Sequence, residues 1–239
     1  MITSTQNATI KDVKKLLMKK YRQKEGRMLI EGKNLLDAAK AHNLLESSFH
    51  LEPRPDYPKG TVLSDHVMRH LTKTKTPPRD AGVAKIPASQ TAGKRVLILE
   101  NVQDPGNVGT LLRSALAFGF DTVVFDESAD PYAQKVMRST QGAIFSLNIL
   151  FDTVPGFKSA YPGHTLVGAH LDRDAKTYEL PADPLALVLG NEGHGLKDST
   201  IRSLDRTVYV QIQNIDSLNV AIAGSIIMHA FSGEKPLFG

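Results

Sequence analysis

The stretch NVQDPGNVGTLLRSALAFG, residues 101–119, carries more polar chemistry than its local structure requires. A turn that leads from a strand into a helix needs residues such as Pro105 and Gly106. Nothing structural needs both the amide of Asn107 and the guanidinium of Arg113, six residues further on. An amide and a guanidinium can together hold and orient a polar substrate. We therefore interpret this stretch as part of a functional site.

The elements that would position these groups follow Gly93, where short apolar runs alternate with helical stretches. This alternation predicts an α/β domain with a mostly parallel sheet covered on both faces. The predicted strands are residues 96–101, 122–128, 165–170, 185–190 and 207–212, and the predicted helices lie near 108–118, 131–140 and 218–232. Such sheets bind ligands at the carboxyl ends of their strands. We expect one polar site there, formed by Asn101, Asn107, Glu192, Asp216, Ser217 and Asn219.

The residue pattern excludes several common chemistries. The stretches DPGNVG and GNEGHG fit neither a dinucleotide-binding fingerprint nor a P-loop. The chain has no Cys, which excludes disulfides, thiolate catalysis and Cys-ligated metal. No metal is predicted, because His164, His170 and His194 lack metal-ligand spacing. Ser217 has no GxSxG elbow around it, so nucleophilic hydrolysis is unsupported.

Positive charge is concentrated in the first part of the chain. Residues 1–90 hold 17 Lys and Arg against 9 Asp and Glu, a net charge of +8. Residues 91–239 hold 12 against 16, a net charge of −4. A solvated helix face and a polyanion-binding surface both fit this excess, with nucleic acid as the first polyanion to consider. The candidate RNA-binding residues are Lys14, Lys15, Lys19, Lys20, Arg22 and Arg27.

Residues 1–90 are predicted to form a small α/β domain of their own. Ile10, Val13, Leu16 and Leu17 have helical spacing, and Ser64 is a suitable N-cap for a short helix. Another helix is predicted over 32–42, strands over 28–32 and 47–52, and a loop, an edge strand and a linker over 72–95. We place the domain boundary near residues 88–94, which gives domains 1–90 and 91–239. The apolar runs are far shorter than the roughly 20 residues of a membrane span, and we expect a cytoplasmic protein.

Each site residue also has a purely structural interpretation. Asn107 could only cap the helix that it precedes, and Ser217 and Asn219 could only cap the last helix. Glu192 could stabilise a nearby helix N-terminus, and Arg113 could be a surface residue of an amphipathic helix. These interpretations explain the residues singly but not jointly.

Three stretches together resemble the signature motifs of one family. NVQDPGNVGTLLRSALAFG, LVLGNEGHGL and SLNVAIAGSI, in this order and at these separations, are similar to the motifs of the SpoU-type (TrmH-like) RNA 2′-O-ribose methyltransferases of the SPOUT superfamily. The resemblance covers about residues 95–232. The segment before it also looks like the substrate-binding domain that many members carry in front.

The resemblance implies a parallel α/β sheet whose C-terminal part is tied into a deep trefoil knot, an exception to the rule that chains do not thread loops. It also implies that the knot binds S-adenosylmethionine and that two subunits pack to complete each site. The cofactor contacts carried over are Leu189, Gly190, Val210, Ile212 and Leu218. Gly190 would suit this role because a residue without Cβ lets the chain pass close to a flat base.

The resemblance also implies a catalytic set. Its members are Asn107 and Arg113 from the first motif, Glu192 from the second, and Ser217 and Asn219 from the third. The chain departs from the family at Val210, Gln211 and Ile212, where Ile-Pro-Met is common, and its following loop is one residue shorter.

We therefore predict an S-adenosylmethionine-dependent enzyme that methylates the 2′-hydroxyl of one ribose in a structured RNA. Ribosomal RNA is the first candidate and tRNA is the alternative. A knotted RNA-binding protein without catalysis and a methyltransferase that acts on a base are rival functions. The presence of Asn107, Arg113, Glu192 and Asn219 argues against an RNA-binding protein without catalysis. We expect a homodimer that needs no metal and no membrane.

Overall fold

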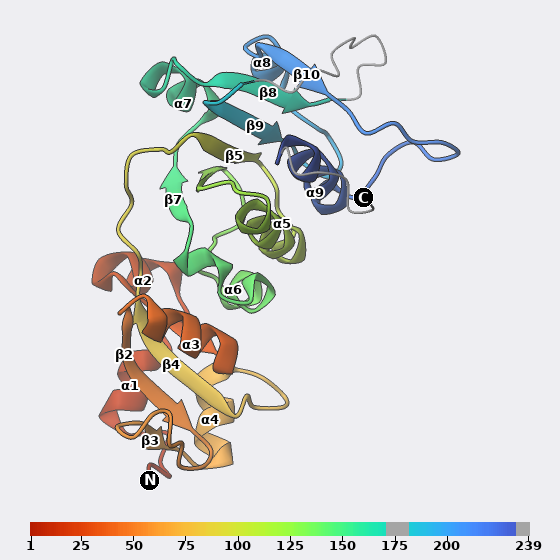
Figure 1. Ribbon diagram of the computed structural model, residues 1–239. Helices are drawn as coiled ribbons and strands as arrows, with labels where there is room; N and C mark the ends of the chain where they lie inside the picture. The colour runs from red at the N-terminus through yellow and green to blue at the C-terminus, as the bar shows by residue number, and fades with distance from the viewer. Residues whose placement is uncertain (171–181, 233–239) are drawn as a thin grey trace. The chain divides into compact units, whose positions relative to one another are not determined.

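The computed structural model describes residues 1–170 and 182–232 of the 239-residue chain, which divides into two compact units (Figure 1). Unit 1 comprises residues 1–88 and 130–145, and unit 2 comprises residues 89–129 and 146–239. Each unit has its own sheet and is described by itself. Within the described ranges no helix is long and apolar enough to cross a membrane.

A four-stranded sheet in the order β1-β4-β2-β3 forms the centre of unit 1. Its strands are β1 (Arg27–Glu31), β2 (Leu45–His50), β3 (Thr61–Val62) and β4 (Asp80–Lys85). The prediction of an edge strand in this last region is wrong, because β4 pairs antiparallel with both β1 and β2. Its small side chains gave a weak strand signal, yet they suit the crowded middle of the sheet. A Cβ at Gly82 would lie 2.7 Å from the carbonyl oxygen of Ser47.

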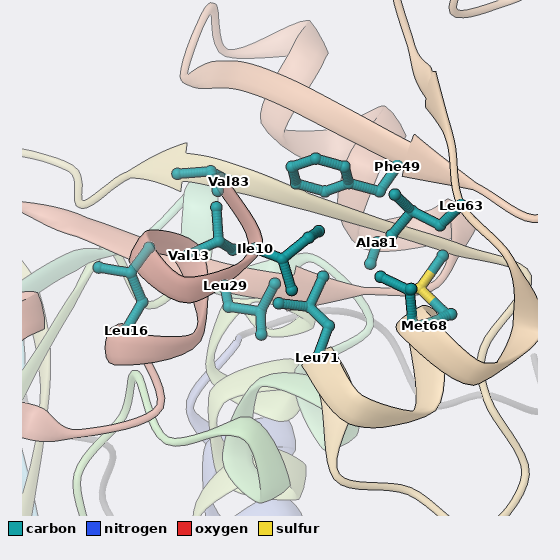
Figure 2. Close-up of a cluster of buried hydrophobic side chains, with 11 residues drawn as sticks. Ile10, Val13, Leu16, Leu29, Phe49, Leu63, Met68, Leu71, Ala81 and Val83 are labelled. Carbon is teal, nitrogen blue, oxygen red and sulfur yellow. The ribbon is translucent and has the colours of Figure 1, made fainter. Parts of the chain in front are cut away.

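The helices of unit 1 complete its core. They are α1 (Ala8–Lys15), α2 (Lys19–Glu25), α3 (Lys33–Ala41), α4 (Asp65–Thr72), α6 (Gln134–Thr140) and the 3-10 helix η1 (Ala143–Phe145). Ile10 and Val13 lie on the buried face of α1, as their spacing predicted, and pack with Leu29 of β1 and Leu71 of α4 (Figure 2). Each such side chain contributes roughly 1.5–3 kcal/mol by leaving water. Ser64 caps α4 as predicted.

Helix α6 joins unit 1 through Glu31 at the end of β1, although the residues on both sides of α6 and η1 belong to unit 2. Gln134 Nε2 donates a hydrogen bond to Glu31 Oε1 at 2.5 Å, and Arg138 Nη1 donates one to Oε2 at 2.9 Å. Burial raises the pKa of the Glu31 carboxyl, and the contacts with Arg138 and Gln134 offset only part of that rise. Unit 1 is therefore completed by a helix from the middle of the chain.

Unit 2 contains a six-stranded sheet in the order β10-β8-β9-β5-β6-β7, and every pairing in it is parallel. Its strands are β5 (Arg95–Glu100), β6 (Thr122–Asp126), β7 (Asn148–Phe151), β8 (Thr165–Ala169), β9 (Leu185–Leu189) and β10 (Arg206–Val208). The predicted parallel sheet is confirmed. The central strands β9, β5 and β6 are buried almost throughout, as expected for a parallel sheet covered on both faces.

Two strands differ from the prediction. β10 pairs with β8 and ends at Val208, so residues 209–212, predicted as strand, are not part of this strand. The edge strand β7 was not predicted, because only Ile149 of its four residues is fully buried and its apolar pattern is short.

The helices in the described part of unit 2 are α5 (Pro105–Ala117), α7 (Val154–Ala160), α8 (Asp198–Ile201) and α9 (Val220–Phe231). Helices α5 and α9 pack against each other (Figure 1). A Cβ at Gly224 of α9 would lie 2.5 Å from Leu189 Cδ1 and 2.7 Å from Leu111 Cδ2. The glycine therefore lets α9 approach both β9 and α5 closely.

Candidate active site

The first site residue, Asn107, lies in the first turn of α5. Asp104 is the N-cap of this helix, and its Oδ1 accepts the backbone N–H of Asn107 at 2.9 Å. Pro105 follows at the first helical position, where a missing N–H costs nothing. The interpretation of Asn107 as a simple cap is therefore wrong, and its side chain is free for other contacts.

Glu192 lies in the loop after β9 and faces the start of α5. Its Oε1 accepts from Asn107 Nδ2 at 3.0 Å and from the backbone N–H of Asp104 at 3.2 Å. The backbone N–H of Gln103 points to Oε2 at 3.4 Å. Partial burial favours a higher pKa for Glu192, but these hydrogen bonds outweigh it and hold the pKa below its usual value. The carboxylate is thus ionised at neutral pH and is a weak base.

Asn219 completes a line of three side chains. It is the N-cap of α9, and its Oδ1 accepts the backbone N–H groups of Ala221 and Ile222. Its Nδ2 donates to Asn107 Oδ1 at 2.9 Å. The capping role considered for Asn219 is confirmed, but it uses only the Oδ1 atom of the side-chain amide. Glu192 likewise lies at a helix N-terminus and also holds Asn107.

The hydrogen-bond directions along this line are fixed by its two ends. A carboxylate can only accept, so Asn107 must turn its Nδ2 toward Glu192 and its Oδ1 toward Asn219. The N–H groups of α9 can only donate, so Asn219 must turn its Oδ1 toward them and its Nδ2 toward Asn107. The three groups therefore form a pre-oriented network at the carboxyl ends of the strands.

A pocket of about 110 Å³ lies between the end of β8 and helix α9, and its lining includes Leu218, the residue before Asn219. Of the residues expected to bind a cofactor, Val210, Ile212 and Leu218 line it, and Ser217 lines it too. Leu189 and Gly190 do not. A Cβ at Gly190 would lie 2.3 Å from the backbone carbon of Gly195, so the chain itself requires this glycine.

Two family models divide the chain between them. Residues 94–229 match the SpoU rRNA Methylase family, and residues 7–81 match the MRM3-like substrate binding domain. The chain belongs to the SpoU rRNA methylase family. The first model covers the sheet of unit 2 and the Glu192–Asn107–Asn219 network.

Relatives within the SpoU family carry named activities. The chain is 33% identical over 245 residues to the 23S rRNA (guanosine(2553)-2'-O)-methyltransferase RlmP of Bacillus subtilis, an alignment that covers 97% of this chain and 99% of the relative. It is 29% identical to the 23S rRNA (uridine(2479)-2'-O)-methyltransferase of Streptomyces viridochromogenes, over 69% of this chain and 63% of the relative. These two relatives are named for different nucleotides of 23S rRNA.

A solved rRNA methyltransferase structure is similar over nearly the whole chain. The AdoMet-bound rRNA methyltransferase of Sinorhizobium meliloti superposes with a TM-score of 0.83 at 26% identity, and the match covers 96% of each chain. The predicted fold class, a parallel-sheet SPOUT domain preceded by a small α/β domain, is confirmed.

Arg113, a residue of the first SpoU motif, does not join the network. Its side chain is exposed on α5, and within the described residues it makes neither a hydrogen bond nor an ion pair. Ser217 is also exposed, two residues before the cap of α9, and does not cap that helix. The structure thus brings Glu192, Asn107 and Asn219 together and leaves Arg113 apart.

The six basic residues expected to bind RNA fall into two groups. Lys15, Lys19 and Lys20 are exposed, and Lys14 is half-buried with its Nζ 2.8 Å from His70 Nε2. The other two are engaged within unit 1. Arg22 is 5% exposed and donates to the carbonyl oxygens of Leu16 and Leu17 and to Asp130, and Arg27 forms ion pairs with Glu25, Asp12 and Glu46.

Two contributions to the site are not evident from the sequence. The backbone N–H groups of Gln103 and Asp104 bind Glu192, and the Asp104 side chain starts α5. An Asp followed by Pro at a helix start was the available signal. In residues 1–170 and 182–232, no cluster of His, Asp or Glu has an arrangement that could hold a metal ion.

Proposed function

We propose that this chain transfers a methyl group from S-adenosylmethionine to a ribose 2′-hydroxyl of ribosomal RNA. The observation that carries the proposal is the Glu192–Asn107–Asn219 network, which unites residues from all three motifs at the strand ends. The Bacillus subtilis relative, named as a 23S rRNA 2'-O-methyltransferase, supports ribosomal RNA as the substrate class.

The residues beside the network fit the cofactor. Val210, Ile212 and Leu218 present apolar surface suited to an adenosine, and Ser217 adds a hydroxyl. Residues 210–212 lie beyond β10, which ends at Val208. S-adenosylmethionine supplies an electrophilic methyl group when it is bound. The AdoMet-bound Sinorhizobium meliloti structure supports this choice of cofactor.

The task of the protein is to align the 2′-oxygen of the ribose and to ease the loss of its proton. We assign the alignment to Asn107, whose amide is held in one orientation by Glu192 and Asn219. Arg113 carries a guanidinium, which offers a positive charge and a planar fork of N–H donors. It orients the ribose or its phosphate and stabilises negative charge on the 2′-oxygen.

A second copy of the chain would bring Arg113 to a site. Leu116 of α5 and Ile222 and Ile226 of α9 are 39%, 53% and 45% exposed, on two helices that pack together. Arg113 precedes Leu116 by three residues and so shares its side of α5. We propose that this apolar surface is the homodimer interface and that Arg113 completes the site of the partner.

Unit 1 provides the RNA-binding surface in this proposal. It carries most of the positive charge, and the match to an MRM3-like substrate binding domain supports the role. We assign the contacts to Lys14, Lys15, Lys19 and Lys20, and we leave out Arg22 and Arg27 because their guanidinium groups are already paired. We further propose that the sequence divides into domains 1–90 and 91–239 and that the second domain contains the trefoil knot. We also propose a cytoplasmic location, where the enzyme would encounter 23S rRNA.

The test is ribose-methylation mapping of 23S rRNA and tRNA from cells with and without the protein. We expect one 2′-O-methyl position in 23S rRNA to disappear in the deletion and to return when purified protein and labelled S-adenosylmethionine are added to the deletion RNA. A vanished tRNA position would redirect the substrate to tRNA. Unchanged methylation in both RNAs, with no label transferred, would contradict the proposed function.

A further inference from the structure

The loop that carries Glu192 is closed by the residue before it. Asn191 and Gly195 exchange two backbone hydrogen bonds, at 3.0 and 2.9 Å. The side-chain Oδ1 of Asn191 accepts the backbone N–H groups of Gly193 at 2.9 Å and His194 at 3.1 Å. The amide oxygen of Asn191 thus fixes the backbone of Gly193 and His194, which follow Glu192 in the loop. The two backbone hydrogen bonds with Gly195 join the ends of this loop.

The same side chain fastens the loop to the end of β5. Asn191 Nδ2 donates to the backbone carbonyl of Asn101 at 2.9 Å. Asn101 has a φ of +55°, a left-handed conformation that Asn tolerates better than most residues. Gln103, only two residues further, offers its N–H to the Glu192 carboxylate. Asn191 therefore links the loop of Glu192 directly to the segment that receives this carboxylate.

Only an amide can make both sets of contacts. Aspartate would keep an oxygen for Gly193 and His194 but would lose the donor to Asn101. It would also place a second negative charge beside Glu192, whose Oε2 is 3.5 Å from Asn191 Nδ2. Alanine would lose both contacts. The position thus requires a neutral donor and acceptor.

We propose that Asn191 is a positioning residue for the methyl transfer, acting through Glu192 and hence through Asn107. The inference rests on the proposed function and adds a residue with no direct contact to the reacting atoms. Displacing the Glu192 loop would release Asn107 from its fixed orientation, and a shift of about 1 Å at a reacting group can cost about 100-fold in rate. The loop belongs to unit 2, whereas the RNA-binding surface proposed above belongs to unit 1.

The test compares Asn191→Ala and Asn191→Asp with a matched control, Asn148→Ala. Asn148 also binds neighbouring main chain with both ends of its amide, accepting from Gln90 and donating to Gln90 and Thr91. It is the first residue of β7, so it lies at an amino end of a strand rather than at the carboxyl ends. The assay uses ribosomal RNA from cells lacking the protein and labelled S-adenosylmethionine.

We expect both Asn191 variants to lose kcat by about 10- to 100-fold, with the KM for RNA and the Kd for S-adenosylmethionine within about threefold of the parent. Asn148→Ala should lower the thermal midpoint by a similar amount as Asn191→Ala but keep the parental kcat. A parental kcat in Asn191→Asp would overturn the proposal, because that variant lacks the Asn101 contact. Equal losses of kcat in Asn148→Ala and Asn191→Ala would overturn it as well.

A double-mutant cycle separates positioning through Glu192 from any other effect. In a Glu192→Gln background, we expect Asn191→Ala to lower kcat by less than about threefold further, because residues that act as one unit are not additive. A full additional loss would show that Asn191 acts elsewhere and would overturn the proposal. Failure of the proposed function is a different result, since the parent itself would then transfer no methyl group to RNA.

Discussion

Asn219 and Asn107 are joined by a 2.9 Å hydrogen bond from Nδ2 to Oδ1, although 112 residues separate them in the chain. The same Asn219 side chain uses its Oδ1 to cap α9. One amide therefore serves the stability of a helix with its oxygen and the orientation of Asn107 with its nitrogen. Because the two roles use different atoms, a suitable substitution can remove one and keep the other.

Asn219→Asp should separate the two roles. Aspartate caps helices about as well as asparagine, so the free energy of unfolding should stay within about 0.5 kcal/mol of the parent. The variant lacks the Nδ2 donor and turns a carboxylate toward Asn107 Oδ1. Methyl transfer should fall by about 100-fold, the scale of losing one pre-oriented group. Denaturant unfolding and single-turnover methyl transfer measure the two effects.

Asn7→Asp is the matched control for that substitution. Asn7 caps α1 in unit 1 with the same pattern, its Oδ1 accepting the N–H groups of Thr9 and Ile10. We expect no change in methyl transfer. If Asn219→Asp and Asn7→Asp both leave the rate at the parental value, the bond between Asn219 and Asn107 has no catalytic role.

The Glu192 carboxylate should add a pH-dependent contribution to stability. Its pKa is held below the usual Glu value of about 4.3 by hydrogen bonds from Asn107 and backbone N–H groups, which outweigh the effect of partial burial. A depressed folded-state pKa stabilises the protein above the unfolded-state pKa, and this contribution is lost as pH falls through the folded-state value. Between pH 7 and pH 3, Glu192→Gln should therefore lose less unfolding free energy than the parent. Parallel pH curves for the two proteins would refute the assignment.

The lysines of α2 should contribute salt-dependent RNA affinity. Lys19 and Lys20 are exposed at its start. Replacing both by Gln should weaken RNA binding and reduce the slope of log K against log salt by roughly 0.7–0.9 for each lost phosphate contact. The control replaces Lys73 and Lys75, exposed lysines in and after the cap of α4, and removes the same charge. Equal effects of the two pairs would mean that net charge, not this surface, determines the affinity.

Mixed dimers test whether Arg113 serves the partner subunit. Arg113→Ala and Glu192→Gln should each be nearly inactive alone. For Arg113→Ala, we expect the rate of methyl transfer to fall by about 100-fold. Co-expressed with different tags and purified as the mixed dimer, they should recover up to half of the parental activity. One site then combines an intact Glu192 with the arginine of the other chain. No recovery in a verified mixed dimer would place Arg113 in the site of its own subunit.

The site could be located from the sequence because parallel strands end at one edge of their sheet. Asn107, Glu192 and Asn219 each follow a strand, and the structure joins them by hydrogen bonds. The sequence does not show that Glu192 and Asn219 each have two roles. A position in a catalytic motif and a preference for a helix N-terminus each explain the residue type without the other. A side chain with two polar atoms can satisfy both.

One arginine could not be placed from the sequence, because its partner is distant in the chain. Arg22 looked like a surface cation, but Asp130, 108 residues away, holds its guanidinium within unit 1. Composition and local spacing do not contain such pairings.

Helix α6 limits how this protein can be recombined with its relatives. The two family matches divide the sequence at a single point between residues 81 and 94, yet Gln134 and Arg138, inside the second match, complete the first unit through Glu31. A chimaera that joins residues 1–88 to a foreign catalytic part would leave the buried Glu31 without its partners Gln134 and Arg138. Exchange of substrate specificity between such enzymes therefore requires two grafts, the amino-terminal segment and residues 130–145 together.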